Sequence, residues 1–204
     1  MAQILKDEIK NRIDKAALLQ FYKDGCQNAT MSNIAKEAGI ATGNIYRYYR
    51  SKDELFYSVI PQDIVKKMLS LIKSRLVALN GMSINEARLT SALKLVDAQL
   101  VEFFITHKMQ LIVAVDKSEG TKYENLKDRI RDMLISNIHD YLKTIGKQDF
   151  LNDKVKNGML KIIMANFIQA FVDISRNIKS NDDLVYAYES LLEYQELGME
   201  KFLS

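Results

Sequence analysis

Residues 30–55 constrain the fold of this chain more than any other stretch. Thr30 is suited to cap a helix that begins at the next residue, because its hydroxyl can accept a hydrogen bond from an unpaired backbone N–H group of the first turn. Gly39 is suited to end that helix, since glycine readily adopts the left-handed conformation of a helix exit. A second short helix is predicted over residues 42–49. The pattern therefore predicts two short helices joined by a tight glycine turn.

A longer helix is predicted after this pair. Ser51 and Glu54 have the spacing of a capping box, in which both side chains bond the backbone of a helix N-terminus. Pro61 lacks a backbone N–H group and disfavours helical geometry in the residue before it, so we expect a kink or break there. The break is a candidate place for motion to pass between domains, and a simple bend around a core is an equal alternative.

The composition favours an all-α protein. The 204 residues include one proline and eight glycines, 48% are hydrophobic and 27% are charged. Apolar residues recur at helical spacing, which predicts further helices over residues 3–24, 84–106, 122–145, 153–178 and 182–203. We expect about nine helices in total, with an N-terminal three-helix domain of residues 1–50 and a larger helical domain of residues 51–204.

Charge and cysteine content exclude several classes of protein. The net charge of +3 is too small for a general polyanion binder, although a sequence-reading protein with a small footprint needs no more. The single cysteine, Cys26, excludes an intrachain disulfide framework and suits a reducing cytosol. The N-terminus lacks a signal-peptide pattern, and charged residues interrupt each apolar stretch before about 18 residues. We therefore expect a cytoplasmic protein without a membrane span.

Two short helices around a glycine turn are typical of the helix-turn-helix, whose second helix enters the major groove of DNA. The motif residues are Ile34-Ala35, Ala38-Gly39-Ile40, Gly43, Tyr46, Tyr48 and Ser51-Lys52-x-Glu54-Leu55, preceded by Ile13, Ala16-Ala17, Phe21 and Gly25. In these residues the chain resembles the TetR family of helix-turn-helix transcriptional regulators, over roughly residues 9–60. The resemblance implies a DNA-binding domain followed by a ligand-binding and dimerisation domain.

The resemblance and the side-chain chemistry together indicate which residues face DNA. Arg47, Asn44 and Tyr46 are suited to contact base edges, whereas hydroxyl groups and Lys52 are suited to hold phosphates. The expected DNA-binding residues are Thr30, Ser32, Thr42, Gly43, Asn44, Tyr46, Arg47, Tyr48 and Lys52.

Two positions depart from the family pattern. Ala41 stands where the family usually has a serine that caps the second helix, so we expect Thr42 to act as the cap one residue later. Tyr49 stands where phenylalanine is common, so its additional hydroxyl must find a partner or water. Because of these two departures, the expected DNA contacts are uncertain by about one residue position. We expect the fold to be unchanged.

The last two predicted helices carry more apolar surface than one subunit can bury. Residues 153–178 are apolar nearly all round, and residues 182–203 have a second apolar face. In the family the last two helices of each subunit form a four-helix interface, so the resemblance implies a homodimer through these segments. A two-fold dimer would place two reading helices about 34–36 Å apart, in successive major grooves.

A small-molecule pocket is expected between the helices of the larger domain, where the resembling family carries its effector site. Pockets are mostly apolar with a few convergent polar groups, and methionine-rich linings adapt to apolar ligands. The expected effector is therefore small and apolar. The candidate ligand-binding residues are Phe56, Ile64, Met68, Phe103, Phe104, His107, Met133, Asn137, Met159, Ile163, Asn166 and Phe167.

Nothing in the sequence favours an enzyme. It contains no phosphate-binding loop, dinucleotide fingerprint or nucleophile elbow, and neither His107 nor His139 has a metal-binding partner at helical spacing. We expect no cofactor and no metal. The predicted function is a ligand-responsive regulator, most simply a repressor, that binds palindromic operator DNA as a dimer. The alternatives are a helical small-molecule-binding protein or enzyme that does not read DNA, and a regulator that acts through a protein partner.

Overall fold

The computed structural model describes residues 2–79, 86 and 89–203, and the side chains from residue 5 onward. Every regular element in these ranges is a helix, which confirms the all-α prediction. The chain divides into two compact units. The first comprises Met1–Lys66 and His107–Asn125, and the second comprises Lys67–Thr106 and Leu126–Ser204.

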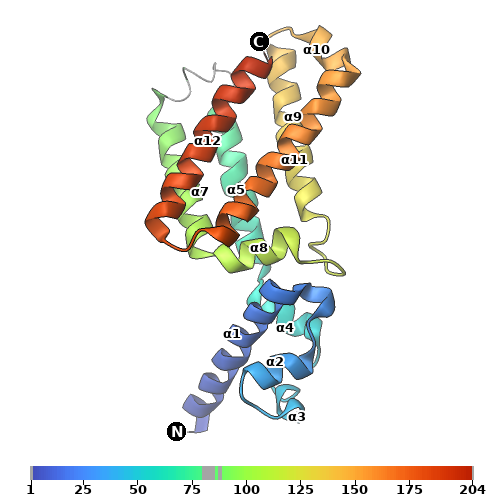
Figure 1. Cartoon of the computed structure of the whole chain (residues 1–204), viewed down its shortest axis with the longest axis vertical. Coiled ribbons are helices and arrows are strands. Elements are labelled where there is room, and N and C mark those ends of the chain that lie inside the picture. Colours follow the sequence, from blue (N-terminus) through green and yellow to red (C-terminus); the bar gives the residue numbers. More distant parts are fainter. Residues whose placement is uncertain (1, 80–85, 87–88, 204) are drawn as a thin grey trace. The chain divides into compact units, whose positions relative to one another are not determined.

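The first unit is built around a long N-terminal helix (Figure 1). Helix α1 contacts α2, α4 and α8. The backbone leaves helical geometry at Gly25, with φ 80° and ψ 163°, directly after the predicted end of the first helix at residue 24. The helices of this unit are α1 (Ala2–Asn28), α2 (Met31–Glu37), α3 (Thr42–Ile45), α4 (Lys52–Val59) and α8 (Lys108–Asp116).

Apolar residues of four helices meet in the core of the first unit. The rings of Phe21 and Phe56 pack edge to face with their centroids 5.2 Å apart, and both side chains are fully buried. Ile13 of α1, Ile34 of α2 and Ile45 of α3 are fully buried too. The stripe that the sequence predicts on the first helix thus holds the two short helices in place by apolar burial.

The predicted break at Pro61 is confirmed. Helix α4 ends at Val59, and Ile60 has φ −119° and ψ 68°, outside the helical region. Helix α5 (Gln62–Leu79) begins directly after the proline. Ser51 caps α4 as predicted, because its hydroxyl accepts from the backbone N–H of Glu54 at 3.1 Å. The Glu54 carboxylate accepts from the backbone N–H of Arg50, one residue before the cap, so the second bond of the predicted capping box is made to a different residue.

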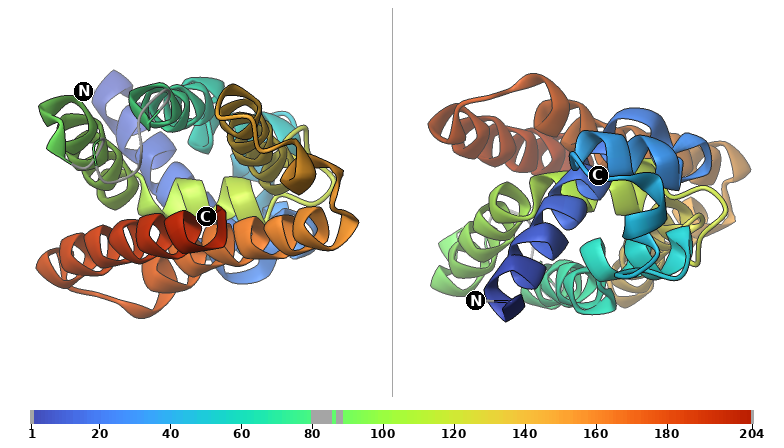
Figure 2. Two further views of the ribbon diagram at one scale, coloured as in Figure 1. Left: turned by 90° about the horizontal axis from the view of Figure 1, so that it is seen from above. Right: turned by 90° about the horizontal axis from the view of Figure 1, so that it is seen from below.

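The second unit is a helical bundle. Helix α11 packs against α9 and α12, and α12 packs against α7; Figure 2 shows α11 and α12 side by side. Its core includes Val101, Phe171, Leu184, Tyr188 and Leu192, and the Tyr188 hydroxyl shares a hydrogen bond with Ser175. Besides most of α5, the helices are α7 (Ser91–Thr106), α9 (Leu126–Thr144), α10 (Gln148–Asn152), α11 (Lys154–Asn177) and α12 (Asn181–Leu203).

The boundaries of two predicted helices differ from the sequence prediction. Helix α9 begins at Leu126 instead of residue 122, because Thr121 Oγ1 donates to the Ser118 carbonyl and accepts from the Tyr123 backbone N–H, which closes a local turn. The predicted helix over residues 84–106 corresponds to α7 from Ser91 to Thr106. Residues 84, 85, 87 and 88 of the prediction lie outside the described residues. The described ranges contain eleven helices, because short elements such as α10 carry too little periodicity to be predicted.

One described helix, α11, is long and apolar enough to cross a membrane by length and composition alone. Its residues Leu160, Met164, Ile168, Phe171 and Val172 are nevertheless buried against other helices of the second unit. The core helix of a globular bundle meets the same criteria, so this feature gives little support to a membrane span.

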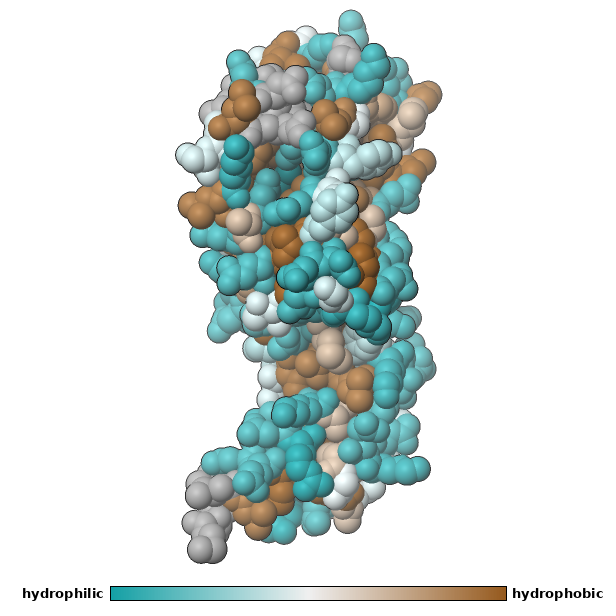
Figure 3. Space-filling view, turned by 60° about the vertical axis from the view of Figure 1, so that its left-hand side comes forward, coloured by the Kyte–Doolittle hydropathy of each residue, from teal (hydrophilic) through white to brown (hydrophobic). Residues whose placement is uncertain are grey.

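Large apolar side chains remain exposed on the second unit. Figure 3 shows hydrophobic residues on its surface among hydrophilic ones. On α11 the exposed residues Val155, Met159 and Ile162 follow helical spacing and share one face. On α12 the exposed large apolar residues are Tyr186, Tyr194 and Leu197. Both helices thus present apolar surface that the described part of the chain does not cover.

Candidate nucleic-acid interface and ligand pocket

Helix α3 exposes nearly all of its side chains. Its one buried residue, Ile45, anchors it to the core, whereas Thr42 and Asn44 are exposed. After α3 the backbone N–H of Arg47 donates to the Asn44 carbonyl at 3.1 Å, so a helical turn continues past the last α-helical residue. The side chain of Tyr46 is 52% exposed, and Arg47 is exposed too. The predicted helix over residues 42–49 is therefore one short helix followed by turns, and its residues Thr42, Asn44, Tyr46 and Arg47 are exposed.

The cap predicted for this helix is wrong. Ala41 occupies the N-cap position and makes no side-chain cap bond, so Thr42 does not act as the cap. The Thr42 hydroxyl instead lies 3.4 Å from the hydroxyl of Ser32 on α2. Two expected DNA-contact residues from neighbouring helices are thereby brought together. Thr30 caps α2 as predicted, accepting from the backbone N–H of Asn33 at 3.1 Å.

Arg12 of α1 holds the turn between the two short helices, a role that sequence reasoning missed. One guanidinium nitrogen, Nη2, donates to the carbonyl of Ala38, and to that of Gly39 at 3.2 Å. A cation at the C-terminal end of α2 also matches the partial negative charge there. Gly39 has φ 67°, and a Cβ atom at this position would lie 2.6 Å from Arg12 Nη2. Glycine at position 39 thus permits both the left-handed backbone turn and the close approach of the Arg12 side chain.

Lys52 is engaged within the protein. Its ammonium group donates to the carbonyl of Cys26 at 2.7 Å, to that of Gln27 at 3.2 Å and to that of Ala29 at 3.0 Å. An ammonium group has three N–H donors, so these bonds use all of them. The side chain that the sequence assigns to a phosphate therefore caps the C-terminal end of α1 in this structure. Burial raises the pKa of the neighbouring Cys26 thiol, as expected for an unreactive structural cysteine.

The hydroxyl of Tyr49 finds its partners inside the protein. Tyr49 is buried; its hydroxyl donates to the Asp14 carboxylate and lies 3.1 Å from Ser58 Oγ. Lys10 forms an ion pair with Asp14 at 2.9 Å, and its ammonium nitrogen lies 5.2 Å from the centroid of the Tyr49 ring. Burial raises the pKa of the Tyr49 hydroxyl, and the bond to the carboxylate adds to the shift. These contacts tie the end of the exposed turn to α1 and α4.

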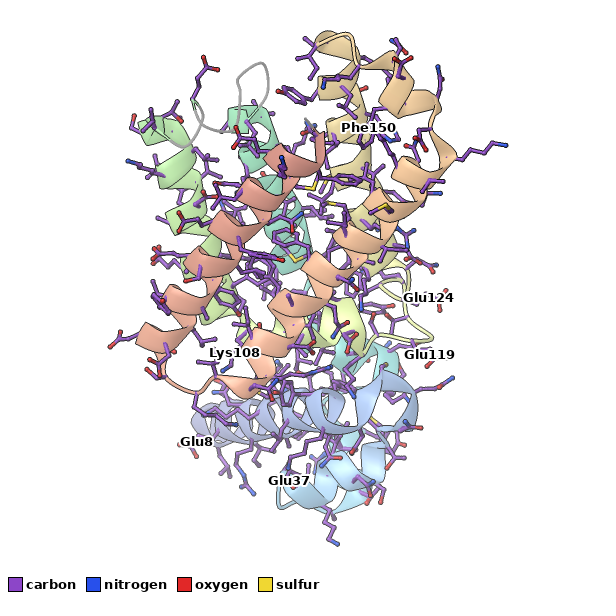
Figure 4. All side chains as sticks on the ribbon, turned by 45° about the horizontal axis from the view of Figure 1, so that its top comes forward. Glu8, Glu37, Lys108, Glu119, Glu124 and Phe150 are labelled. Carbon is purple, nitrogen blue, oxygen red and sulfur yellow. The ribbon has the colours of Figure 1, made fainter. Side chains whose placement is uncertain are left out.

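The loop between α8 and α9 holds the end of α4. The backbone N–H of Lys122 donates to the Tyr57 hydroxyl at 2.9 Å, and the Lys122 ammonium lies 4.2 Å from the centroid of the Tyr57 ring. Tyr123 donates to the carbonyl of Ile60, the residue before the proline, at 3.4 Å. Figure 4 labels Glu119 and Glu124 on this loop. The break between α4 and α5 is thereby fixed on the first unit.

The second unit contains a cavity of about 110 Å³ between α5, α9, α11 and α12. Of the predicted ligand-binding residues, Asn137 and Phe167 line it. Its described lining consists of Arg75, Leu76, Leu79, Leu134, Asn137, Ile138, Tyr141, Met164, Phe167, Gln195, Glu196, Met199 and Leu203.

The other predicted ligand-binding residues lie elsewhere. Phe56, Ile64 and His107 belong to the first unit, where Phe56 is part of the core. Phe104 packs on Phe171 and Tyr188 in the core of the second unit. Met68 is fully buried, Asn166 and Met159 are exposed, and Phe103, Met133 and Ile163 are half-buried, all outside the lining described above.

The polar wall of the cavity comes from residues that the sequence did not single out. Arg75 Nε donates to Asp97 Oδ1 at 2.7 Å, and Arg75 Nη2 donates to the carboxylate of Glu196. The Arg75 side chain is only 11% exposed. In the same wall, Gln195 Nε2 is buried and finds no hydrogen-bond partner in the described part of the chain. No sequence pattern predicts the pairing of Glu196 with Arg75, because α5 and α12 are distant in the chain and meet only in the folded bundle.

No described group of three or more His, Cys, Asp or Glu side chains could hold a metal ion. His139 instead has a structural role: its Nε2 lies 2.8 Å from Asn157 Oδ1. Asn157 Nδ2 in turn donates to the backbone carbonyls of Phe150, Leu151 and Asp153, so these contacts hold the turn around α10.

Comparison with known proteins agrees with the helix-turn-helix geometry. Residues 13–59 match the bacterial regulatory proteins of the tetR family. The chain is 40% identical over 57 residues to the HTH-type transcriptional regulator SAUSA300_2515 of Staphylococcus aureus (strain USA300), covering 28% of this chain and 31% of that protein. It is 41% identical over 61 residues to the HTH-type transcriptional regulator SAB2452 of S. aureus (strain bovine RF122 / ET3-1), covering 29% and 33%. The match thus spans about a third of the length of these curated relatives.

The fold extends the likeness beyond this segment. A TetR-like transcriptional regulator from Rhodococcus sp. RHA1 superimposes with a TM-score of 0.51 at 22% sequence identity, covering 90% of this chain and 92% of that one. At this identity the likeness concerns the fold alone. The likeness in sequence is confined to the helix-turn-helix segment, residues 13–59, which is similar to the bacterial regulatory proteins of the tetR family.

Proposed function

We propose that this protein is a cytoplasmic, ligand-responsive transcriptional regulator, most simply a repressor, that binds palindromic operator DNA as a homodimer. Residues 1–50 would be its DNA-binding domain and residues 51–204 its ligand-binding and dimerisation domain. The observation that carries the proposal is the exposure of polar side chains on α3 and its following turn, inside the segment that matches the family. The named function of the curated relatives, transcriptional regulation, supports a regulator over an enzyme.

We assign base contacts to the exposed side chains at the tip of the first unit. Arg47 has the donors to bond a guanine edge or a phosphate, and Asn44 can bond an adenine edge. Gly43 leaves open space beside the helix, since a Cβ atom there would meet nothing within 4 Å. Tyr46 would contact bases or sense groove shape.

Hydroxyl groups would position the helix on the DNA backbone. The paired hydroxyls of Ser32 and Thr42, 3.4 Å apart, can donate to one phosphate from two helices. Thr30 and Tyr48 would add contacts to neighbouring phosphates. We assign Lys52 to positioning α4 against α1, because its three donors already bond backbone carbonyls.

The homodimer would form through α11 and α12. Support comes from the exposed apolar residues of both helices, which include Ile162 at 62% and Tyr194 at 74% exposure. A stable interface usually buries about 1,600 Å² in total, and two long helices from each subunit provide surface on that scale. Two copies would then present two α3 helices to successive major grooves.

The cavity of the second unit would be the effector site. Its mostly apolar lining with few polar groups is typical of small-molecule sites. A ligand acts on DNA binding only if it binds the two conformational states of the protein with different affinity. The chain connects the two units at residues 66–67, 106–107 and 125–126, and these connections are the covalent routes for such coupling.

Selection of DNA from a random-sequence duplex library by the full-length protein tests the DNA-binding part. We expect a palindromic sequence with two half-sites about one helical turn apart. Arg47→Ala should weaken binding to the selected duplex about tenfold or more at moderate salt. Arg129→Ala removes the same charge from an exposed position on α9 and serves as the control.

The selection also separates the alternatives. If Arg47→Ala binds the enriched duplex as well as the unmodified protein, the contact assigned to Arg47 is wrong. If no sequence is enriched at all, the DNA-reading proposal itself is wrong. A protein that binds small molecules or a protein partner without reading DNA would give that result.

A further inference from the structure

The size of the cavity limits what can enter it. Its volume of about 110 Å³ is close to that of an engineered apolar cavity of about 150 Å³ that takes up benzene. Its walls include Phe167 and Tyr141, whose rings can pack against a flat ligand, and the methionines Met164 and Met199. The enclosed part of an occupant is therefore about the size of one ring.

The charges of the wall disfavour an anionic occupant. Arg75 is the only basic residue among the described residues of the lining. Its guanidinium already donates to the carboxylates of Asp97 and Glu196. An anionic ligand would have to displace a carboxylate from this part-buried ion pair and would also face Glu196, which lines the cavity. Carboxylates and phosphates therefore lack a cation to bind here.

Gln195 lies in the same wall and carries a hydrogen-bond donor that a rotation of its side chain can turn toward the cavity. Its Nε2 atom is buried and has no hydrogen-bond partner among the residues that the structure describes, and the residue lines the cavity. A buried amide N–H group without a partner costs free energy, which an acceptor atom on a ligand would recover. Carbonyl, ether and hydroxyl oxygens are neutral acceptors of this kind.

We propose that the cavity binds a neutral, ring-sized apolar molecule with one acceptor oxygen that bonds Gln195 Nε2. The inference rests on the proposed function, in which this cavity is the effector site. It adds the class of ligand, and it disfavours ligands that place an anionic group inside the cavity.

Three probes of nearly equal size test the proposal in the full-length protein. Acetophenone carries an acceptor oxygen, ethylbenzene lacks one, and benzoate is anionic. The methyl signals of Met164 and Met199 in NMR spectra report binding at the cavity, while Met31, buried in the first unit, is an internal reference. We expect acetophenone to shift the first two signals to saturation. Ethylbenzene should bind about tenfold more weakly, and benzoate more weakly still.

The variant Gln195→Met keeps the size of the side chain and removes the donor. It should abolish the preference for acetophenone over ethylbenzene, whereas Gln99→Met, at an exposed position of α7, should keep it. The comparison of probes in the unmodified protein needs no variant, so the proposal is tested even if Gln195→Met folds poorly.

Each outcome addresses a different part of the argument. Benzoate binding as tightly as acetophenone, or equal binding of acetophenone and ethylbenzene, overturns the ligand class and leaves the effector site standing. If none of the three probes shifts Met164 or Met199, the cavity does not take up such molecules, and the proposed ligand class is wrong. DNA selection by the same protein remains an independent measurement of the DNA-binding proposal.

Discussion

The ammonium group of Lys52 lies 2.7 Å from the carbonyl oxygen of Cys26 and thereby joins the start of α4 to the end of α1. Lys52 also bonds the carbonyls of Gln27 and Ala29. The first N–H groups of α4 are capped by Ser51, so each of the two helix ends is satisfied by a side chain from residues 51–52. The short segment after the exposed turn therefore determines how α4 meets the long first helix.

Lys52→Met should lower the free energy of unfolding by about 1–3 kcal/mol, because several backbone carbonyls lose their donor. Urea denaturation measures the change, and Lys66→Met at an exposed position is the control. The salt dependence of DNA binding should keep its slope. A slope reduced by about one unit would mean that Lys52 contacts a phosphate in the complex, contrary to the positioning role.

Gly39→Ala should destabilise the protein by about 1–2 kcal/mol, because an L-residue is strained at φ 67°. The new methyl group would also displace Arg12 from the Ala38 and Gly39 carbonyls. Gly43→Ala is a matched control, since Gly43 is helical and a Cβ atom there meets nothing within 4 Å. Thermal denaturation compares the two variants. Equal midpoints would show that the left-handed turn is not needed.

Tyr49→Phe should cost about 1 kcal/mol at neutral pH, because Asp14 loses a hydrogen-bond donor. The pH dependence gives a second signature. The pKa of Tyr49 is raised in the folded protein, so above pH of about 10 the unfolded chain loses a proton that the folded chain retains. Stability therefore falls as the pH rises through this range.

In Tyr49→Phe the free energy of unfolding should fall less steeply with rising pH than in the unmodified protein. The difference in slope is at most about 1.4 kcal/mol per pH unit, the value for one proton. Tyr46→Phe, at a 52%-exposed position of the first unit, should follow the unmodified protein when DNA is absent. Denaturant titrations between neutral and alkaline pH measure the slopes. Equal slopes for Tyr49→Phe and the unmodified protein would contradict a raised pKa of Tyr49 in the folded protein.

Ile162→Glu should convert the dimer to a monomer, because a carboxylate on the exposed apolar face of α11 would be buried without a partner in the interface. Leu95→Glu, on the 61%-exposed leucine of α7, should leave the dimer intact. Analytical ultracentrifugation at micromolar concentration distinguishes the two states. An unmodified protein that sediments as a monomer would rule out the proposed interface.

Local signals were sufficient to predict most of the first unit. Thr30, Gly39, Ser51 and Pro61 act within a few residues of their own position, and the structure has the caps, the turn and the break that they predict. The exception is Ala41, where the helix begins without a side-chain cap. Thr42 was predicted to replace it, but its hydroxyl lies near Ser32, a residue that only the packing of α2 on α3 brings close.

The candidate cavity shows the opposite case. Helical periodicity identified Asn137 and Phe167 as facing inward, but it also selected Phe56, which is core in the first unit. Periodicity shows that a face is buried and cannot show against which helix. Gln195 looked like an ordinary polar residue of the last helix, and its unpartnered amide is visible only once α5, α9 and α11 surround it.

The sequence by itself determined the long helices, the caps at Thr30 and Ser51, the break at Pro61 and the exposed polar tip of the helix-turn-helix, because these depend on backbone preferences and on residues close in the chain. The tertiary structure alone decided that Lys52 and Arg12 would bond carbonyls at helix ends and that Arg75 would meet Glu196. Such charged groups can pair with whichever partner the fold brings near. Their roles follow from contacts between distant segments, which no local pattern specifies.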